Sequence, residues 1–135
     1  MEDKVLHYMR RGAITCSDDT SVREVAQIMV VNNIQYCIII NRNNEVLGII
    51  SARSILRAFG KDMDETRAKD ILLPYSITIT PNSSIQDSVD LMRKKRIDTL
   101  IVVSDRPGSN AVLGIITASD VVRRSINGAG GENHD

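Results

Sequence analysis

The chain has 135 residues, of which 42% are hydrophobic and 25% are charged, a composition typical of a globular protein. Its 17 basic and 17 acidic residues cancel and only 3% of its residues are aromatic, so it lacks the basic excess and the stacking rings expected of a nucleic-acid-binding protein. No apolar run reaches the roughly 18 residues that span a bilayer and the first residues carry no signal-peptide core, so we expect a cytoplasmic protein outside the membrane.

The first half of the chain predicts alternating helices and strands. In chain order we expect a short helix at 4–9, a strand at 13–17, a helix at 18–29, strands at 36–40 and 46–50, and a helix at 51–59. The helix at 18–29 opens with small polar residues that cap helices, and it places Val22, Val25 and Met29 on one face. The segment 36–40 is apolar throughout, as strands covered on both faces are.

The second half predicts the same order of elements after a linker. We expect a short helix at 66–72, a strand at 76–80, a helix at 81–92, strands at 100–103 and 112–116, and a helix at 117–126. In the helix at 81–92, Ile85, Val89 and Met92 share one face. The last residues, 128–135, offer nothing to bury, and we expect them to be disordered.

The two halves are copies of one repeat. The phrase VLGIISARSILRA at 46–58 returns as VLGIITASDVVRR at 112–124, and the segments 13–41 and 76–104 upstream align without a gap. A domain of about 60 residues buries only about 60% of its unfolded surface. We therefore expect a mixed α/β (α+β) fold in which two β-α-β-β-α units share an interface. The expected boundaries are 4–60 for the first unit, 61–75 for the linker, 76–127 for the second unit and 128–135 for the tail.

The repeated phrase carries a motif that resembles the end of a CBS (cystathionine-β-synthase) domain. That family ends a strand with G-h-h-[ST]-x-x-[DN]-h, where h is apolar, and this chain has GIITASDVV at 114–122 and the degraded copy GIISARSIL at 48–56. The chain is therefore similar to a stand-alone tandem CBS pair, or Bateman module, over 4–127. The resemblance implies two units related by a pseudo-twofold axis, with two equivalent clefts between them. It also implies a regulatory protein, not an enzyme, that senses an adenosyl ligand such as AMP, ADP, ATP or S-adenosylmethionine.

The second copy of the motif offers the better nucleotide site. Gly114 permits the close approach of a ligand or of another backbone segment. Thr117 lies where the strand gives way to a helix whose free amides attract phosphate, and Asp120 can accept hydrogen bonds from both hydroxyls of a ribose. The same spacing also fits a capping box, in which Thr117 and Asp120 close the helix start without a ligand. Both arrangements can hold in different ligation states.

The resemblance implies further ligand-binding residues around this pair. They are Ser119, Asp98 and an adenine slot of Ile77, Thr78, Thr80, Pro81, Thr99, Leu100 and Ile101, whose apolar members equally fit a core. Relatives that hold several phosphates often carry a basic residue where this chain has Asp98, and an acid there repels phosphate. Arg53, Arg57, Arg123 and Arg124 remain as phosphate contacts or as solvated surface. With an acid at position 98 and only these arginines to bind phosphate, AMP, ADP or S-adenosylmethionine is favoured over ATP as the effector. No cofactor is required.

The first copy replaces the acid by Ser54, whereas Ser51 keeps the hydroxyl. Hydrogen bonds to a charged group contribute roughly 1.5–3 kcal/mol and neutral ones about 1 kcal/mol, so the exchange is expected to weaken a ribose contact by about tenfold or more. The first cleft is therefore expected to be empty, a weaker second site, or suited to a different ligand. Its residues would be Ser51, Ser54, Arg53, Gln35 and Tyr36.

The sequence contains no pattern for catalysis or for a metal site. Cys16 and Cys37 lie in apolar segments without a base nearby, and the only histidines are His7 and His134, so no zinc constellation is expected. We expect both cysteines to be buried free thiols, although a disulfide stays open.

An exchange on the first helix of each repeat indicates a homodimer. Val30 and Val31 stand where the other copy has Arg93 and Lys94, and the extra apolar residues indicate either a covered surface or partial burial against the linker. The resemblance implies dimerisation through these helices. The leading hypothesis is a module that binds an adenosyl ligand and regulates a partner protein. The alternative is a ligand-independent interaction module with vestigial clefts.

Overall fold

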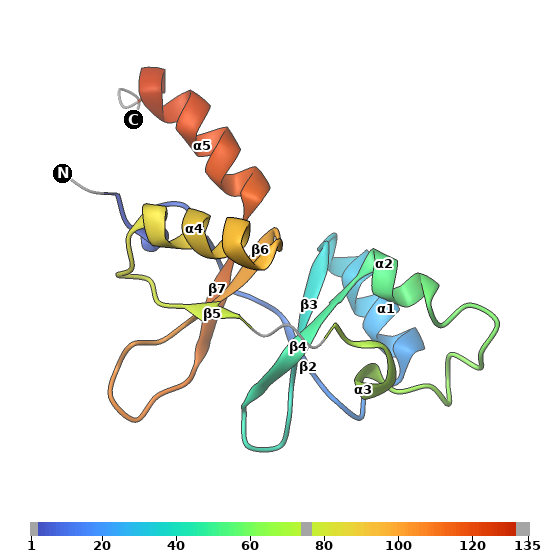
Figure 1. The fold of residues 1–135 in the computed structure, drawn as a ribbon. Helices are drawn as coiled ribbons and strands as arrows, with labels where there is room; N and C mark the ends of the chain where they lie inside the picture. Colours follow the sequence, from blue (N-terminus) through green and yellow to red (C-terminus); the bar gives the residue numbers. More distant parts are fainter. Residues whose placement is uncertain (1–2, 74–76, 132–135) are drawn as a thin grey trace. The chain divides into compact units, whose positions relative to one another are not determined.

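The computed structural model describes residues 3–73 and 77–131, which form two sheets with helices packed against them (Figure 1). The chain divides into two compact units, one of Met1–Gly12 with Ile77–Asp135 and one of Ala13–Ser76. We call them the Asp120 unit and the Ser54 unit, after the residue that each has at the equivalent position of the repeated phrase. Strands and helices are mixed in both units, so the predicted α/β fold class is confirmed.

The Ser54 unit is built on a three-stranded sheet of order β2-β3-β4. β2 (Thr15–Ser17) is parallel to β3 (Tyr36–Ile40), which pairs antiparallel with β4 (Val46–Ser51). The helices are α1 (Val22–Asn32), α2 (Ala52–Leu56) and α3 (Ala68–Ile71). α1 begins after Ser21, whose hydroxyl accepts a hydrogen bond from Glu24 N–H, and it is closed by Asn33 at a left-handed φ of 52°.

The Asp120 unit is built on a four-stranded sheet of order β1-β7-β6-β5. The strands are β1 (Arg10–Arg11), β5 (Thr78–Ile79), β6 (Thr99–Val103) and β7 (Val112–Thr117). β5 is parallel to β6, and β7 pairs antiparallel with both β6 and β1. A 3-10 helix, η1 (Val5–His7), precedes β1, and the α-helices are α4 (Ile85–Lys95) and α5 (Ala118–Gly131).

Each unit has its own hydrophobic core. In the Ser54 unit the core includes Cys16, Val22, Val25, Met29, Cys37, Ile39 and Ile50. In the Asp120 unit it includes Val5, Ile79, Met92, Leu100, Val102 and Ile116. The helix face predicted from the spacing of Val22, Val25 and Met29 is therefore the buried one, as expected when apolar burial is the main stabilising contribution.

The two short helices pack with the repeat that they do not directly precede. η1 comes before the first repeat, yet Val5 N–H donates a hydrogen bond to Ser83 O in the second repeat at 2.9 Å. α3 comes before the second repeat, yet Ala68 N–H donates to Thr20 O in the first at 2.8 Å. The compact units thus combine segments that the repeat boundaries separate along the sequence.

α5 is longer than the sequence predicts. It runs to Gly131 and so enters the tail 128–135 that is expected to be disordered, while 132–135 lie outside the described residues. Neither this helix of 14 residues nor any other helix in the described part of the chain combines the length and the apolar character needed to cross a membrane.

Cys16 and Cys37 are neighbours in the core of the Ser54 unit. The Cys37 thiol donates a hydrogen bond to Cys16 Sγ at 3.1 Å, and the buried free thiols that the sequence predicts are confirmed. The hydrogen bond to Cys16 and then burial raise the pKa of Cys37. The hydrogen bond that Cys37 donates lowers the pKa of Cys16.

Candidate functional site

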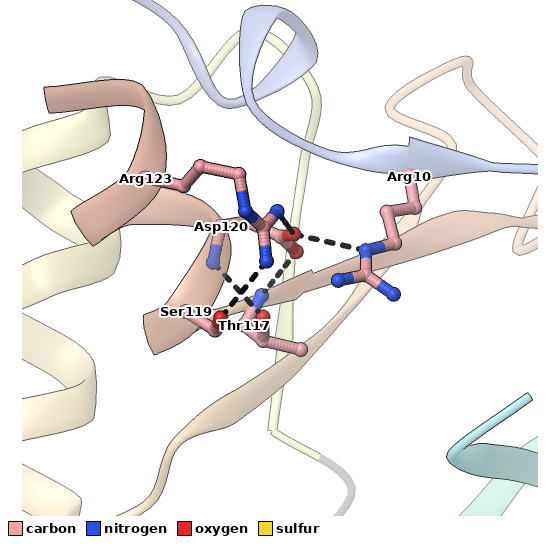
Figure 2. Close-up of polar contacts among 5 residues, drawn as sticks. All are labelled: Arg10, Thr117, Ser119, Asp120 and Arg123. Atoms are coloured by element: carbon pink, nitrogen blue, oxygen red, sulfur yellow. Dashed lines mark hydrogen bonds and ion pairs between the residues drawn. The ribbon is translucent and has the colours of Figure 1, made fainter. Parts of the chain in front are cut away.

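The candidate site is the junction at which β7 ends and α5 begins. Thr117 is the last residue of β7, and Asp120 lies in the first turn of α5. Thr117 N–H donates to Asp120 Oδ2 at 3.0 Å, and Asp120 N–H donates to Thr117 Oγ1 at 3.1 Å (Figure 2). Both residues are buried, with relative exposures of 7% and 5%. The capping box, one of the two interpretations that the spacing allows, is therefore formed.

Two arginine side chains converge on the Asp120 carboxylate (Figure 2). Arg10 Nε donates to Asp120 Oδ1 at 2.9 Å, and Arg123 Nη1 donates to the same oxygen at 3.3 Å. Arg123 also donates from Nη2 to Ser119 Oγ at 3.0 Å. The Asp120 side chain is 4% exposed, whereas those of Arg10 and Arg123 are 52% and 56% exposed. The buried carboxylate is thus neutralised from the solvent side, which offsets the cost of removing its charge from water.

Arg10 reaches the junction because β1 pairs with β7. Arg10 is opposite Ile115, and Arg11 is opposite Gly114. A Cβ atom at Gly114 would collide with the carbonyl oxygen of Arg10, so a glycine is required for this approach. The close contact that the sequence predicts at Gly114 is therefore made by another backbone segment of the same unit.

In the Ser54 unit a backbone segment likewise passes close to a glycine, and we call this close approach in either unit the strand crossing. Leu73 forms a bridge with Ile49, and a Cβ atom at Gly48 would collide with the carbonyl oxygen of Leu73. Leu73 therefore occupies the position that Arg10 occupies in the Asp120 unit. The interval of 63 residues between them (73 minus 10) is the one that relates the aligned segments 13–41 and 76–104.

The serine pair forms the equivalent capping box at the start of α2. Ser54 N–H donates to Ser51 Oγ at 3.3 Å, and Ser51 N–H donates to Ser54 Oγ at 3.1 Å. Tyr36 is close to this box because it pairs with Ser51 across β3 and β4. The other residues predicted for this second site, Gln35 and Arg53, are exposed, and so is Arg57, which is predicted only as a phosphate contact.

The residues predicted to hold an adenine lie on β6 and in the segment 77–81 around β5. Thr99 is buried and pairs with Thr117 across the ladder of β6 and β7. Leu100 belongs to the core, so the core interpretation holds for this residue. Ile101 is buried, and its N–H donates to Ile77 O at 3.1 Å. Along the β5 segment the remaining predicted residues are exposed or partly exposed: Thr78, Thr80 and Pro81.

Two further charged residues from the prediction have different surroundings. Asp98 lies beside the start of α5, where its backbone carbonyl accepts a hydrogen bond from Ala118 N–H at 2.9 Å. Its carboxylate accepts one from Thr99 Oγ1 at 3.2 Å. Arg124 lies over the ring of Tyr8, 5.5 Å from its centroid, so its guanidinium group packs against the end of η1.

Arg10 is the site residue that sequence reasoning missed. It belongs to a strand of two exposed residues, which has no periodicity to recognise. A signal was nevertheless present in the repeat. Extending the alignment upstream pairs Arg10 with Leu73, and this exchange accompanies that of Asp120 for Ser54.

Two hollows among the described residues, one in each unit, are lined by residues outside the junction. One of about 380 Å³ runs along α4 between Ile79 and Lys94, and one of about 360 Å³ lies between Cys16 and Arg42 in the Ser54 unit. Neither is lined by Thr117 or Asp120, so the junction is identified by its hydrogen bonds and charges. Within residues 3–73 and 77–131, no group of three or more His, Cys, Asp or Glu side chains could hold a metal ion.

Comparison with known sequences finds one family twice along the chain. The sequence model of the CBS domain matches residues 5–61 and 68–127. The uncharacterized protein MK0525 of Methanopyrus kandleri is 32% identical over 117 residues, which are 84% of this chain and 58% of that protein. The chain therefore spans little more than half the length of this relative.

Two solved structures have a similar fold. The CBS domain pair of protein MJ0100, in complex with 5′-methylthioadenosine and S-adenosyl-L-methionine, is 24% identical with a TM-score of 0.80 and covers 96% of this chain and 99% of its own. The CBS domain protein PAE2072 of Pyrobaculum aerophilum, complexed with AMP, is 24% identical with a TM-score of 0.73 and covers 87% and 88%.

Proposed function

The chain belongs to the CBS-domain family, and we propose that it is a regulatory module whose junction of β7 and α5 binds an adenosyl ligand. The observation that supports this most is a buried carboxylate beside a hydroxyl at the start of α5, with Asp120 and Thr117 held by mutual hydrogen bonds. A carboxylate accepts hydrogen bonds from both hydroxyls of a ribose. A threonine hydroxyl at the positive end of a helix dipole attracts phosphate.

The ligands of two proteins with the same fold support the adenosyl class. The pair of MJ0100 was solved with 5′-methylthioadenosine and S-adenosyl-L-methionine, and PAE2072 was solved with AMP. All three ligands contain an adenosine whose ribose carries two neighbouring hydroxyl groups. A single carboxylate such as that of Asp120 can accept from both.

The charges around the junction favour a ligand with little negative charge. Arg10 and Arg123 are balanced by Asp120 and by Asp98 beside the start of α5. Because cations and acids are equal in number, a triphosphate would meet too few counter-charges. We therefore favour AMP, ADP or S-adenosylmethionine over ATP.

Binding at this junction would change contacts that hold two elements. Both arginines donate to Asp120 Oδ1, and Thr117 N–H donates to Oδ2. A ribose that takes either oxygen therefore alters a contact to β1, to α5 or within the capping box. A ligand that binds the altered arrangement more tightly shifts the protein towards it. A partner protein that contacts β1 or α5 would respond to that shift.

Isothermal titration calorimetry of the whole chain with AMP, ADP, ATP and S-adenosylmethionine tests the proposal. We expect binding of at least one of the favoured ligands and weaker binding of ATP. Asp120→Ala is expected to weaken binding at least about tenfold, because hydrogen bonds to a charged group contribute roughly 1.5–3 kcal/mol. Ser54→Ala, at the equivalent position of the other unit, is the matched control and is expected to change the affinity much less. Flat titrations with all four ligands would overturn the proposal.

A second function, an interaction module that needs no ligand, is favoured by a specific observation. The Asp120 carboxylate is already satisfied by protein donors, while apolar side chains on or beside α1 and α2 are exposed. Their relative exposures are 80% for Val30, 82% for Val31, 64% for Leu56 and 69% for Phe59. Large exposed apolar side chains in neighbouring helices indicate an interface.

We propose that a second copy of this chain covers these side chains, with the Val30–Val31 end more deeply buried than the Arg93–Lys94 end. Sedimentation equilibrium of the ligand-free chain tests this, since the monomer has a mass of 14.9 kDa. The double variant Val30→Glu, Val31→Glu is expected to dissociate the dimer. The double variant Arg93→Glu, Lys94→Glu, at the equivalent positions of α4, is expected to leave it intact. A wild-type monomer at 100 μM would contradict the proposed dimer.

A further inference from the structure

We propose that Arg10 selects the ligand of the β7–α5 junction by contacting a phosphate group. In this inference its guanidinium group, held on Asp120 through Nε, offers its two terminal nitrogen atoms to the anion. The inference rests on the proposed adenosyl-binding function and narrows the ligand class. It predicts that a phosphate-bearing ligand such as AMP binds more tightly than the uncharged adenosine.

The hydrogen bonds of the two arginines at the junction differ. Arg123 uses both terminal nitrogens, Nη1 on Asp120 and Nη2 on Ser119. Arg10 uses Nε alone, and within the described part of the chain its Nη1 and Nη2 make no hydrogen bond. Figure 2 shows the dashed line from Asp120 ending on Nε of Arg10, with none drawn to the two terminal nitrogens. With its side chain 52% exposed, Arg10 is the arginine of the pair whose two terminal nitrogens both remain available to a ligand.

The contact with Asp120 also prepares Arg10 for binding. A free arginine loses side-chain entropy when it is fixed on a ligand, and a planar guanidinium group that is already held loses less. A pair of parallel N–H groups matches two oxygen atoms of one phosphate. The Nε contact therefore fixes the orientation of the guanidinium group and leaves its two terminal nitrogen atoms available to bind phosphate.

The backbone of Arg10 is set in register with the proposed site. Arg10 pairs with Ile115, two positions before Thr117 on the same strand, and Gly114 permits the close approach of the two strands. A phosphate near the Thr117 hydroxyl at the start of α5 would thus lie on the strand that Arg10 borders. In this arrangement Asp120 binds the ribose of the ligand and Arg10 binds its phosphate.

The other unit supplies an internal comparison. There Leu73 occupies the position of Arg10 and Ser54 that of Asp120, whereas the capping box itself is kept. Both charges are therefore absent together from the copy that is expected to bind weakly. If the arginine served only to stabilise the close approach of β1 to Gly114, the Ser54 unit would need an arginine as well. The same close approach of a backbone segment to a glycine is present there, at Gly48, but the residue is Leu73.

The test compares AMP with adenosine on the whole chain. Calorimetry gives the affinity for AMP, and displacement of AMP gives that for adenosine, in the wild type, Arg10→Met and the control Arg11→Met on the same strand. We expect Arg10→Met to weaken AMP binding by about tenfold or more while changing adenosine binding less than about threefold. Arg10→Lys keeps the charge but loses the pair of parallel N–H groups, so its affinity for AMP is expected to lie between those of the wild type and Arg10→Met. Arg11→Met is expected to change the affinity for neither AMP nor adenosine. Thermal melts followed by circular dichroism check that each variant is folded.

Several outcomes would overturn the inference while leaving adenosyl binding intact. An equal loss for AMP and adenosine in Arg10→Met means that Arg10 only positions Asp120. An equal gain means that Arg10 competes with the ligand for the carboxylate. Unchanged affinities for both ligands mean that it has no role in binding. If the wild type binds neither AMP nor adenosine, nor any other adenosyl compound, the proposed function fails and the inference fails with it.

Discussion

Arg10 Nε donates a hydrogen bond to Asp120 Oδ1 at 2.9 Å, and the equivalent positions of the other unit hold Leu73 and Ser54. Both units nevertheless keep a reciprocal capping box at the start of the helix. The box is therefore what the two copies share, and the ion pair is what distinguishes them. Substitutions that convert one copy into the other separate the structural role of Asp120 from the role of its charge.

Asp120→Ser is expected to destabilise the fold less than Asp120→Ala does. A serine can accept the amide hydrogen bond, as Ser54 accepts from Ser51 N–H, whereas alanine leaves the buried Thr117 N–H without an acceptor. We expect costs of about 1 kcal/mol for serine and about 2 kcal/mol for alanine in the free energy of unfolding. Urea unfolding followed by circular dichroism measures both. Equal costs would mean that the hydrogen bond from Thr117 N–H to the side chain at position 120 contributes nothing to stability.

Arg10 and Asp120 are expected to couple by about 1 kcal/mol in the ligand-free protein, because the carboxylate is buried but solvent screens the half-exposed arginine. A double-mutant cycle with Arg10→Met and Asp120→Asn measures the coupling by urea unfolding. The value is expected to fall in 1 M NaCl, where the screening length is about 3 Å. Arg23 and Asp64, an ion pair with both members exposed, provide the control cycle. A coupling no larger than that of this control pair would contradict the prediction.

The repeat makes most of the fold predictable from the sequence. α1 and β3 follow from apolar spacing that secondary structure imposes locally, and their counterparts α4 and β6 follow from the same spacing in the second copy. Thr117 and Asp120 could be found because one motif spans the strand end and the helix start, so their contact depends on positions three residues apart. Apolar periodicity and helix capping depend only on residues that are close along the chain. These helices and strands and the motif at Thr117 and Asp120 can therefore be predicted from a single sequence.

The parts that could not be predicted depend on contacts between distant segments. β1 consists of Arg10 and Arg11, and it is a strand only because β7 pairs with it. η1 packs with the repeat that is remote in sequence, and no local pattern shows which repeat a short helix joins. The ion pair of Arg10 with Asp120 spans 110 positions; the repeat shows that both residues are exchanged in the other copy, but their contact follows only from the close approach of β1 to β7 at Gly114.

Gly114→Ala and Gly48→Ala are each expected to destabilise the fold by several kcal/mol. A methyl group at either position collides with a backbone carbonyl oxygen, of Arg10 or of Leu73, and a backbone segment cannot move aside as a side chain can. Gly108→Ala is the control, because Gly108 has open space around it and only its φ of +77° is strained, at a cost of about 1 kcal/mol. Urea unfolding ranks the three variants. Costs for Gly114→Ala and Gly48→Ala no larger than that of the control would show that the strand crossings are not tight.

The pair of Cys16 and Cys37 is expected to make the protein less stable at high pH. In the unfolded chain both thiols ionise near pH 8.5. In the folded chain the hydrogen bond to Cys16, and then burial, raise the pKa of Cys37, so this thiol keeps its proton. Its contribution to stability is thus fully present below about pH 8.5 and is lost as the pH rises towards the pKa of the folded state. Cys16, whose pKa is lowered, is ionised in both states well above pH 8.5 and adds no further slope.

Urea unfolding between about pH 7 and pH 10.5 measures this contribution, which has a limiting slope of about 1.4 kcal/mol per pH unit for one proton. Cys37→Ala is expected to remove that slope. Cys16→Ala is expected to keep part of it, because Cys37 stays buried but loses the hydrogen bond that is the larger cause of its raised pKa. Tyr8 and other groups that titrate in this range are common to all three proteins and cancel in the comparison. Identical slopes for the wild type and Cys37→Ala above about pH 9 would mean that the Cys37 thiol ionises as readily in the folded core as in the unfolded chain.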